Sequence, residues 1–317
     1  MKICMVGHGA FAQKHMDAID KIDGVEVATI CGRRPENTQE AAEARGIPHW
    51  STDLAECLAQ PGIEAAIITS ATQVHAAQAI QCLEAGVHVE VEIPMADTLA
   101  DSQAIHAAQQ KSGKIAMAGH TRRFNPSHQW IHNKIVAGEL KLLQLDVQTY
   151  FFRRTNMNAA GKPRSWTDHL LWHHACHTVD LFQYQTGGKK ATQAFAVQGP
   201  MHPDLGIAMD MSIGMKSESD AICTLSLSFN NDGPLGTFFR YICDNGTYIA
   251  RYDDLVDGNE TPIDVSKVDV SMNGIELQDR EFFAAIKEGR EPNSSIAQCL
   301  PAMETLDRLE QCLNSQD

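Results

Sequence analysis

A glycine pattern near the first residue places the strongest constraint on how this chain folds. Residues 2–6 form a short apolar run typical of a buried strand, and G-x-G-x-x-A follows at once, ahead of a helical pattern. In a strand–turn–helix unit the first glycine permits the tight turn, the second admits a pyrophosphate, and the small third residue lets helix and strand pack. The helix N-terminus offers N–H groups to the phosphates. This pattern predicts a dinucleotide-binding turn made of Gly7, His8, Gly9, Ala10, Phe11 and Ala12.

The end of the second expected strand, at 25–31, indicates which dinucleotide is bound. Gly32 is followed there by Arg33 and Arg34, and no carboxylate occurs before Glu36. An acidic residue in this place binds the ribose hydroxyls of NAD, whereas an arginine accommodates the 2′-phosphate of NADP. A guanidinium can also stack on the adenine. The alternative is a solvated basic turn, but together with the glycine pattern Arg33 and Arg34 predict NADP.

Strands and helices alternate up to residue 120. Further strands are expected at 65–69, 87–91 and 115–119, with helices between them and one at 125–138. This alternation predicts an α/β fold with a parallel, doubly wound sheet, in other words an N-terminal Rossmann dinucleotide-binding domain over 1–120. Ligands of such sheets bind at the carboxyl ends of the strands.

The second half, 121–317, has a different pattern. It predicts an α+β domain with an open, mainly antiparallel sheet, which would serve for substrate binding and oligomerisation. An open sheet commonly buries its face against another subunit, so we expect a homo-oligomer, either a dimer or a tetramer. The expected strands are 142–152, 191–198, 209–215, 221–229, 237–243 and 248–252, and the expected helices are 170–186, 279–288 and 298–313.

Composition excludes several classes of protein. A net charge of −14 argues against binding to nucleic acid or to an anionic membrane surface. Nine cysteines without a C-x-x-C pair are typical of reduced thiols in a cytoplasmic protein. We expect no membrane span and no signal peptide, because the apolar runs are short and the chain opens on a strand. The segment 120–165 is the exception in charge, with eight cationic residues against two acidic ones, and it predicts a site for a small anion.

The layout and a series of short motifs resemble the glucose–fructose oxidoreductase/inositol dehydrogenase family. The motifs are the opening glycine pattern, the loop with His75, Glu92-Ile93-Pro94, the run 119–126, His177-Thr178-Val179-Asp180 and 278–282. The resemblance implies hydride transfer to a nicotinamide cofactor, with His177 as the catalytic histidine. It also implies that the cofactor contacts Thr69, Ser70, Ala71, His75, Glu92, Ile93 and His120.

Two departures from the family pattern alter the expected substrate. The lysine of the usual Glu-Lys-Pro is Ile93 here, and the aspartate four residues before the catalytic histidine is His173. Ordinary lysine-centred polyol oxidation is therefore not expected. With the arginines and histidines of 153–174, the resemblance narrows to a branch that oxidises a cyclic hemiacetal bearing two carboxylates during aromatic degradation.

Hemiacetal oxidation requires a base for the hydroxyl proton, and histidine has a suitable pKa. His169, His173 and His177 recur at i, i+4 and i+8, which predicts a shared helix face. His177 would act as the base while His173 orients it or binds the ring, although the reverse assignment stays open. Zinc is not predicted, because neither H-E-x-x-H nor a third ligand is evident. Structural roles for His169, His173 and His174 are the alternative.

A small dicarboxylate substrate would account for the basic segment. Bidentate guanidinium groups suit carboxylates, and two or three of the five candidates would bind it, with Arg123 partly structural. Two other functions stay open: another NADP-dependent sugar or polyol dehydrogenase, and a non-enzymatic NADP sensor. The candidates are Arg122, Arg123, Arg153, Arg154 and Arg164.

Overall fold

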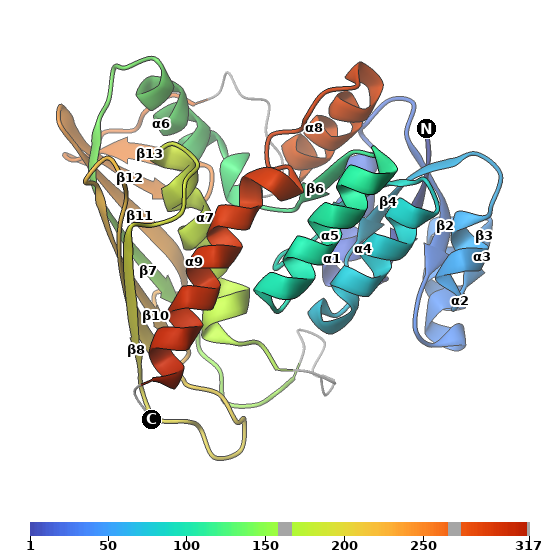
Figure 1. Cartoon of the computed structure of the whole chain (residues 1–317), viewed down its shortest axis with the longest axis horizontal. Helices are drawn as coiled ribbons and strands as arrows, with labels where there is room; N and C mark the ends of the chain where they lie inside the picture. Colours follow the sequence, from blue (N-terminus) through green and yellow to red (C-terminus); the bar gives the residue numbers. More distant parts are fainter. Residues whose placement is uncertain (158–166, 266–273, 316–317) are drawn as a thin grey trace. The chain divides into compact units, whose positions relative to one another are not determined.

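The computed structural model describes residues 1–157, 167–265 and 274–315, and these divide into two units (Figure 1). The first unit contains Met1–Phe124 together with the described residues from 274 to Leu300. The second contains the described residues from Asn125 to 265 and from Pro301 to 315.

The first unit is built on a six-stranded parallel sheet in the order β3-β2-β1-β4-β5-β6. Outward growth from β1 in both directions creates a switch point where neighbouring strand ends diverge, which is where such sheets bind ligands. The predicted doubly wound α/β fold is confirmed. The strands are β1 Lys2–Val6, β2 Glu26–Cys31, β3 His49–Ser51, β4 Ile63–Ile68, β5 His88–Val91 and β6 Ala116–Ala118.

Helices follow the strands of this sheet in alternation. The short β3 and α3 lie between the expected second and third strands and had no clear apolar period in the sequence. The helical segments up to residue 124 are α1 Ala10–Ile19, α2 Pro35–Arg45, α3 Leu54–Leu58, η1 Thr72–Val74, α4 His75–Glu84, α5 Leu99–Ser112 and the single turn η2 Thr121–Arg123.

Helix α8, Ile275–Glu288, belongs to the first unit, although the division predicted at residue 120 assigned it to the second domain. Phe282 and Phe283 on α8 are buried in the same apolar core as Ile3 of β1 and Met16 of α1. Burial of two aromatic side chains contributes several kcal/mol. That gain ties a segment late in the sequence to the first sheet.

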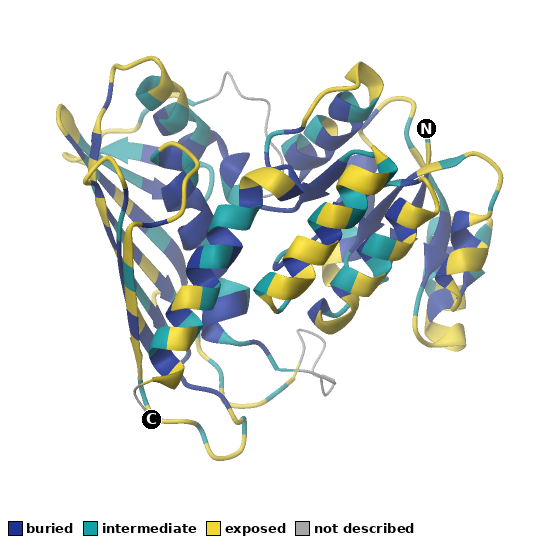
Figure 2. Ribbon diagram, viewed as in Figure 1, coloured by how far each residue is buried: buried dark blue, intermediate teal, exposed yellow. Residues whose placement is uncertain are grey.

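The second unit is built on a seven-stranded mixed sheet in the order β13-β12-β11-β7-β10-β9-β8. Among the described strand pairs of this sheet only β7–β10 is parallel, so the sheet is mainly antiparallel, as predicted. Buried and exposed residues alternate along β10, as its banding in Figure 2 shows, so one face of the sheet is covered and the other is open. The strands are β7 Leu142–Tyr150, β8 Gln193–Gln198, β9 Asp210–Lys216, β10 Ile222–Ser228, β11 Gly236–Cys243, β12 Gly246–Arg251 and β13 Asp254–Asp257.

Helical segments pack against this second sheet. The expected helix 170–186 consists of a π-helical turn, η3 Leu170–Ala175, followed by α7 Cys176–Gln185. Trp172 of η3 donates through Nε1 to Glu310 at 2.8 Å, which ties the turn to α9. The remaining helices are α6 Pro126–Val136 and α9 Ile296–Asn314, and α9 passes from the first unit into the second at residue 300.

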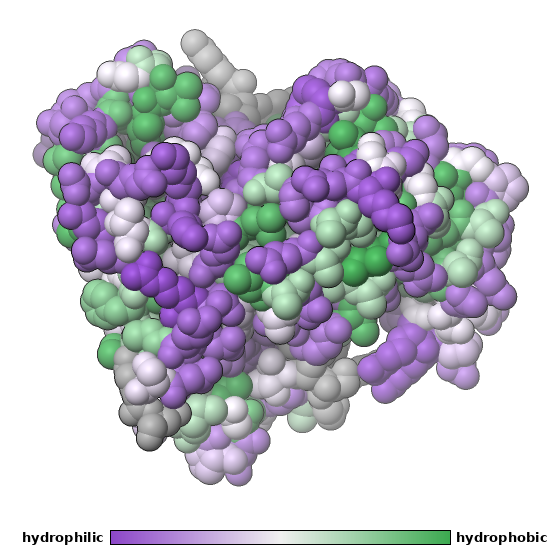
Figure 3. All heavy atoms as spheres, viewed as in Figure 1, coloured by the Kyte–Doolittle hydropathy of each residue, from purple (hydrophilic) through white to green (hydrophobic). Residues whose placement is uncertain are grey.

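Among the described residues no helix is long and apolar enough to cross a membrane. On the face drawn in Figure 3, hydrophilic and hydrophobic residues are interspersed. All nine cysteines are free thiols, and every one except Cys312 is buried.

Candidate functional site

The phosphate-binding turn has the local geometry that the glycine pattern requires. Gly7 has φ of +107°, and a Cβ there would lie 2.6 Å from Thr69 Oγ1 and 2.9 Å from the Thr69 carbonyl carbon. Both the conformation and the space therefore require glycine. Ala12 is fully buried in the core between β1 and α1, so a larger residue would separate helix from strand.

Gly9 leaves room for a phosphate at the start of α1. A Cβ at Gly9 would have no heavy atom of a non-adjacent residue within 4 Å, so a glycine keeps open space there. Among the described residues no side chain caps the N-terminus of α1, and the first turn of this helix contains no acidic residue. The helix thus presents N–H groups and a positive dipole end toward that space, which suits an anion. His8 is partly exposed beside it, while Ala10 and Phe11 are exposed.

The turn after β2 presents two exposed guanidinium groups. The guanidinium groups of Arg33 and Arg34 form neither a hydrogen bond nor an ion pair with any residue in the described ranges. The backbone carbonyl oxygen of Arg34 accepts from the Thr38 hydroxyl at 2.7 Å and from the Thr38 N–H at 3.0 Å. Gly32 is hemmed in, because a Cβ would lie 2.2 Å from Thr38 Oγ1 and 2.8 Å from His8 Cδ2. The backbone is thus fixed while both arginines stay available to an anionic ligand.

His75 joins two loops at the carboxyl ends of β4 and β5. Its Nδ1 lies 2.9 Å from the carbonyl oxygen of Pro94, and its Nε2 lies 3.1 Å from that of Ser70. Burial lowers the pKa of His75, so the neutral ring donates to one of these oxygens at a time. The structure gives this residue, which was expected at the cofactor, a contact with the loop backbone.

The other residues expected in these loops occupy varied surroundings. Thr69 donates through its backbone N–H and its hydroxyl to the carbonyl oxygen of Val6, at 2.7 and 3.1 Å. Ser70 donates to Gln78 Oε1 at 2.5 Å, and Ala71 is the extended residue before the turn η1. Ile93 is partly exposed after β5, where its apolar side chain cannot carry charge.

A buried network of charged residues lies beside the carboxyl ends of these strands, and some of its members carry no sequence signal. His15 is fully buried on α1, with Nδ1 2.8 Å from Asp279 Oδ1 and Nε2 3.1 Å from Glu92 Oε1. Gln278 donates to Glu90 Oε1 at 2.7 Å. Asp279 and Gln278 belong to the motif at 278–282, but His15 carried no motif signal.

Protonation within this network follows from its isolation. Burial by itself would lower the pKa of His15, but Asp279 and Glu92 outweigh burial and hold it well above its usual range. Burial raises the pKa of Glu90, and the neighbouring Asp279 adds to this effect. We therefore assign a protonated His15 and a neutral Glu90. Ligand atoms of His15, Glu90 and Asp279 lie within 4.8 Å of one another, but hydrogen bonds already engage both nitrogens of His15, so the cluster is a hydrogen-bond network.

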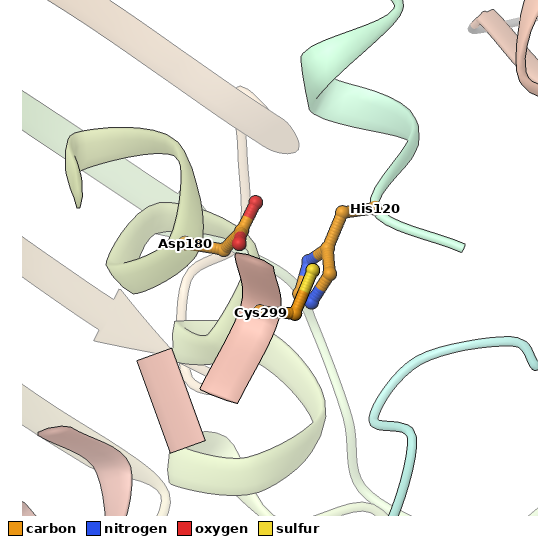
Figure 4. A group of neighbouring side chains, drawn as sticks. All are labelled: His120, Asp180 and Cys299. Carbon is orange, nitrogen blue, oxygen red and sulfur yellow. The ribbon is translucent and has the colours of Figure 1, made fainter. Parts of the chain in front are cut away.

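Gly119, after β6, makes room for the carboxylate of Glu92. A Cβ at Gly119 would lie 2.7 Å from Glu92 Oε1 and 3.1 Å from Gln278 Nε2. The next residue, His120, is buried, and Figure 4 shows its ring beside the sulfur of Cys299 at the start of α9. The end of β6 is therefore closely packed by polar side chains.

The histidines of the second unit lie around the π-helical turn. His169 has extended backbone angles and precedes the helix, so the three histidines do not form the single α-helical face that was expected. The His169 backbone N–H donates to Nδ1 of His173 at 3.0 Å, and the ring of His169 accepts from the Leu171 N–H at 3.2 Å. His173 and His177 are both partly exposed, on η3 and α7 respectively.

The five candidate arginines have different environments. Arg123 is buried and donates to Gln298 Oε1 at 3.2 Å and to the Gln298 carbonyl oxygen at 3.4 Å, so it anchors the start of α9. Arg122 is partly exposed beside it on η2. Arg153 pairs with Asp168, and Arg154 is exposed at the surface. Arg164 lies outside the described residues.

Comparison with known proteins places the chain among oxidoreductases. Residues 1–120 match the family model described as "Oxidoreductase family, NAD-binding Rossmann fold", and 126–269 match "Bacterial oxidoreductases, C-terminal". The chain is 66% identical over 316 residues, covering 100% of both chains, to 4-carboxy-2-hydroxymuconate-6-semialdehyde dehydrogenase of Sphingobium sp. strain NBRC 103272 / SYK-6. The chain belongs to the glucose–fructose oxidoreductase/inositol dehydrogenase family.

More distant similarities cover part of the sequence or the fold alone. The NAD(+)-dependent scyllo-inositol 2-dehydrogenase of Bacillus subtilis strain 168 is 28% identical over 60% of this chain and 55% of its own. An oxidoreductase from Agrobacterium radiobacter, solved in complex with NAD+, L-tartaric acid and magnesium, has a TM-score of 0.86 at 18% identity. That match covers 100% of this chain and 97% of the other, and at this identity it shows the fold alone.

Several family motifs have structural roles here. Phe124, in the run 119–126, is buried in the core of the first unit. In the late motif, Gln278 and Asp279 join the network around Glu92, and Arg280 pairs with Glu276 at 2.7 Å. Gln278 and Asp279 therefore hold the end of β5 and the residue after it through Glu90 and Glu92.

Proposed function

We propose that this oxidoreductase uses NADP to oxidise the cyclic hemiacetal of 4-carboxy-2-hydroxymuconate-6-semialdehyde to 2-pyrone-4,6-dicarboxylate, in the protocatechuate 4,5-cleavage route of aromatic degradation. One observation carries the proposal: 66% identity along the whole length to the dehydrogenase named for this semialdehyde. The absence of lysine at Ile93 fits a substrate other than the usual polyols.

The first unit has the features that an NADP molecule requires. Gly7 and Gly9 give the turn its shape and its open space, and the uncapped start of α1 suits the pyrophosphate. Arg33 and Arg34 are free to bind a 2′-phosphate, because the described residues do not engage their guanidinium groups. When bound, the oxidised cofactor would accept the hydride that leaves the hemiacetal carbon.

The hydroxyl proton requires an acceptor, and the hydrogen bonds of His173 support His177 in that role. Because Nδ1 of His173 accepts from a backbone N–H, its neutral ring carries the proton on Nε2. Such a ring donates a hydrogen bond and has no second lone pair for a proton. We therefore assign His177 as the general base and His173 as a donor that orients the substrate.

The protein's surroundings and assembly are also part of the proposal. Nine free thiols suit a reducing compartment, so we place the enzyme in the cytoplasm. We propose a homo-oligomer formed through the open face of the second sheet. Phe195 and Val197 on β8 and Ile222 on β10 are exposed large apolar side chains there.

Initial-rate assays test the proposal directly. The purified protein would receive the semialdehyde with NADP or with NAD, and reduced-nicotinamide absorbance and product would be followed. We expect turnover that prefers NADP and yields the pyrone dicarboxylate. Tight NADP binding without turnover of this substrate would refute the proposed reaction and leave the oxidoreductase fold in place.

A further inference from the structure

Two contacts within the second unit hold the guanidinium of Arg153 in one orientation, and a third fixes its backbone. Arg153 follows β7, and its backbone N–H donates to the carbonyl oxygen of Phe229 at 2.8 Å, beside the end of β10. Its Nη2 forms an ion pair with Asp168. The guanidinium also lies 4.5 Å from the centroid of the Phe229 ring. A flexible side chain is thus fixed by an ion pair on one side and an aromatic ring on another.

Asp168 is itself held in place as a carboxylate. Its side chain is 11% exposed, and His174 Nε2 lies 3.5 Å from Oδ2. His174 contacts the ring of Phe229 edge-on, with 5.0 Å between centroids. Burial would raise the pKa of Asp168, but hydrogen bonds from His174 and Arg153 outweigh burial and hold it well below its usual range. The anchor of Arg153 therefore stays ionised across the neutral range.

One N–H donor of this guanidinium, Nη1, is not engaged by the described residues. The side chain of Arg153 is 13% exposed, and Nη1 is buried without a hydrogen-bond partner in the described part of the chain. A buried donor on a charged group is costly to leave unsatisfied, so an acceptor that reached Nη1 would be stabilising.

The neighbouring Arg154 differs in this respect. Its Nη1 donates to the Phe229 carbonyl oxygen at 3.3 Å and to Asn230 Oδ1 at 3.1 Å, and its guanidinium lies 4.1 Å from the Phe152 centroid. The protein already engages Arg154, which is exposed at the surface.

We propose that Arg153 receives one of the two substrate carboxylates through Nη1, with Asp168 and Phe229 fixing its plane, and so selects a dicarboxylate over a monocarboxylate. This inference rests on the proposed function, and it goes beyond it by assigning one arginine to one carboxylate. His174 acts as a positioning residue, since it contacts Asp168 and Phe229.

Binding of three pyrones to the enzyme saturated with oxidised cofactor tests the assignment. The probes are 2-pyrone-4,6-dicarboxylate, 2-pyrone-4-carboxylate and 2-pyrone-6-carboxylate, titrated calorimetrically into wild type, R153M, R154M and R251M. Arg251 is the matched control, because its guanidinium also lies over a phenylalanine ring, 4.7 Å from the Phe238 centroid, and it is exposed.

We expect R153M to bind the dicarboxylate and one of the monocarboxylates roughly 10- to 100-fold more weakly than wild type. The affinity for the other monocarboxylate should fall by under about 3-fold. R251M should bind all three as wild type does, and R154M should show the smaller loss. If R153M does not fold, R153K keeps a charge for Asp168 but lacks the planar fork, and it should show the same selective pattern.

Two results would overturn the assignment: unchanged affinities in R153M, or equal weakening of both monocarboxylates, which indicates general damage. Turnover of the semialdehyde by the wild type distinguishes a failure of this assignment from a failure of the proposed function. If the wild type turns over the semialdehyde while R153M binds all three pyrones as the wild type does, only the role of Arg153 is refuted. A wild type that neither turns over the semialdehyde nor binds any pyrone refutes both.

Discussion

His15 Nδ1 lies 2.8 Å from Asp279 Oδ1, and the same ring reaches Glu92 Oε1 at 3.1 Å through Nε2. One fully buried imidazole therefore joins α8, late in the sequence, to the loop after β5. That loop carries Ile93 at the carboxyl edge of the parallel sheet, where a cofactor binds in this fold. The network thus holds the loop after β5 against α1 and α8.

Removing one carboxylate of this pair should be strongly destabilising. D279N leaves a buried His15 charge with a weaker partner, and we expect a loss of about 3–5 kcal/mol in the free energy of unfolding, measured in urea. K189M breaks the exposed pair of Lys189 with Glu218 and serves as the control, with an expected change under about 1 kcal/mol. Equal effects of the two substitutions would contradict a buried ionic network.

Stability should decline on the alkaline side because of His15. The pKa of His15 is raised in the folded state by Asp279 and Glu92, against the opposing effect of burial. Its contribution is therefore fully present below the unfolded pKa of about 6.5 and is lost as pH rises through the folded value. Unfolding free energies measured from pH 6 upward should fall more steeply in wild type than in H15Q. Parallel curves would mean that His15 is neutral in the folded protein.

Cofactor preference should depend on the turn after β2. In R33A/R34A we expect the KM for NADP to rise roughly 10- to 100-fold, because charged hydrogen bonds to the 2′-phosphate are lost, while the KM for NAD changes little. R240A, which removes an exposed arginine of β11, is the control. A similar rise for both cofactors would show that the arginines do not read the 2′-phosphate.

The two partly exposed histidines should differ in their kinetics. H177Q should lower kcat by roughly 10²- to 10⁴-fold and abolish the acidic limb of the pH–rate profile. H173Q retains a hydrogen-bond donor, so it should keep that limb and show a smaller loss of kcat. H173L has no donor and should lose more of its kcat. Disappearance of the limb in H173Q but not in H177Q would reverse the assignment of the base.

Assembly should depend on the open face of the second sheet. Phe195, 60% exposed on β8, is the most exposed phenylalanine among the described residues. F195E should lower the molar mass measured by light scattering, since a charge would be desolvated in an apolar interface. V136E, at an exposed position on α6, should leave the mass unchanged. A wild-type monomer would contradict the proposed homo-oligomer outright.

The sequence by itself determined most of the strands and helices and the fold class of the first unit, because their signals are local. Gly7, Gly9 and Ala12 specify a strand–turn–helix by backbone conformation and side-chain size, and apolar alternation marks β10 and its neighbours. The family motifs identified His75, Glu92 and Asp279 as candidate site residues, but the spacing of the motifs did not distinguish a structural role from a catalytic one.

Tertiary structure decided which residues meet. His15 and Asp279 are 264 positions apart, and Arg153 and Asp168 are 15 apart, with neither pair joined by a helix or strand period. Such pairs form because apolar packing brings α8 onto α1, or one chain segment against another, and burial then forces the charges to find partners. The same packing places α8 in the first unit and leaves Nη1 of Arg153 without a hydrogen-bond partner among the described residues. The local sequence sets the chemistry of a side chain, whereas its neighbours depend on how distant segments pack.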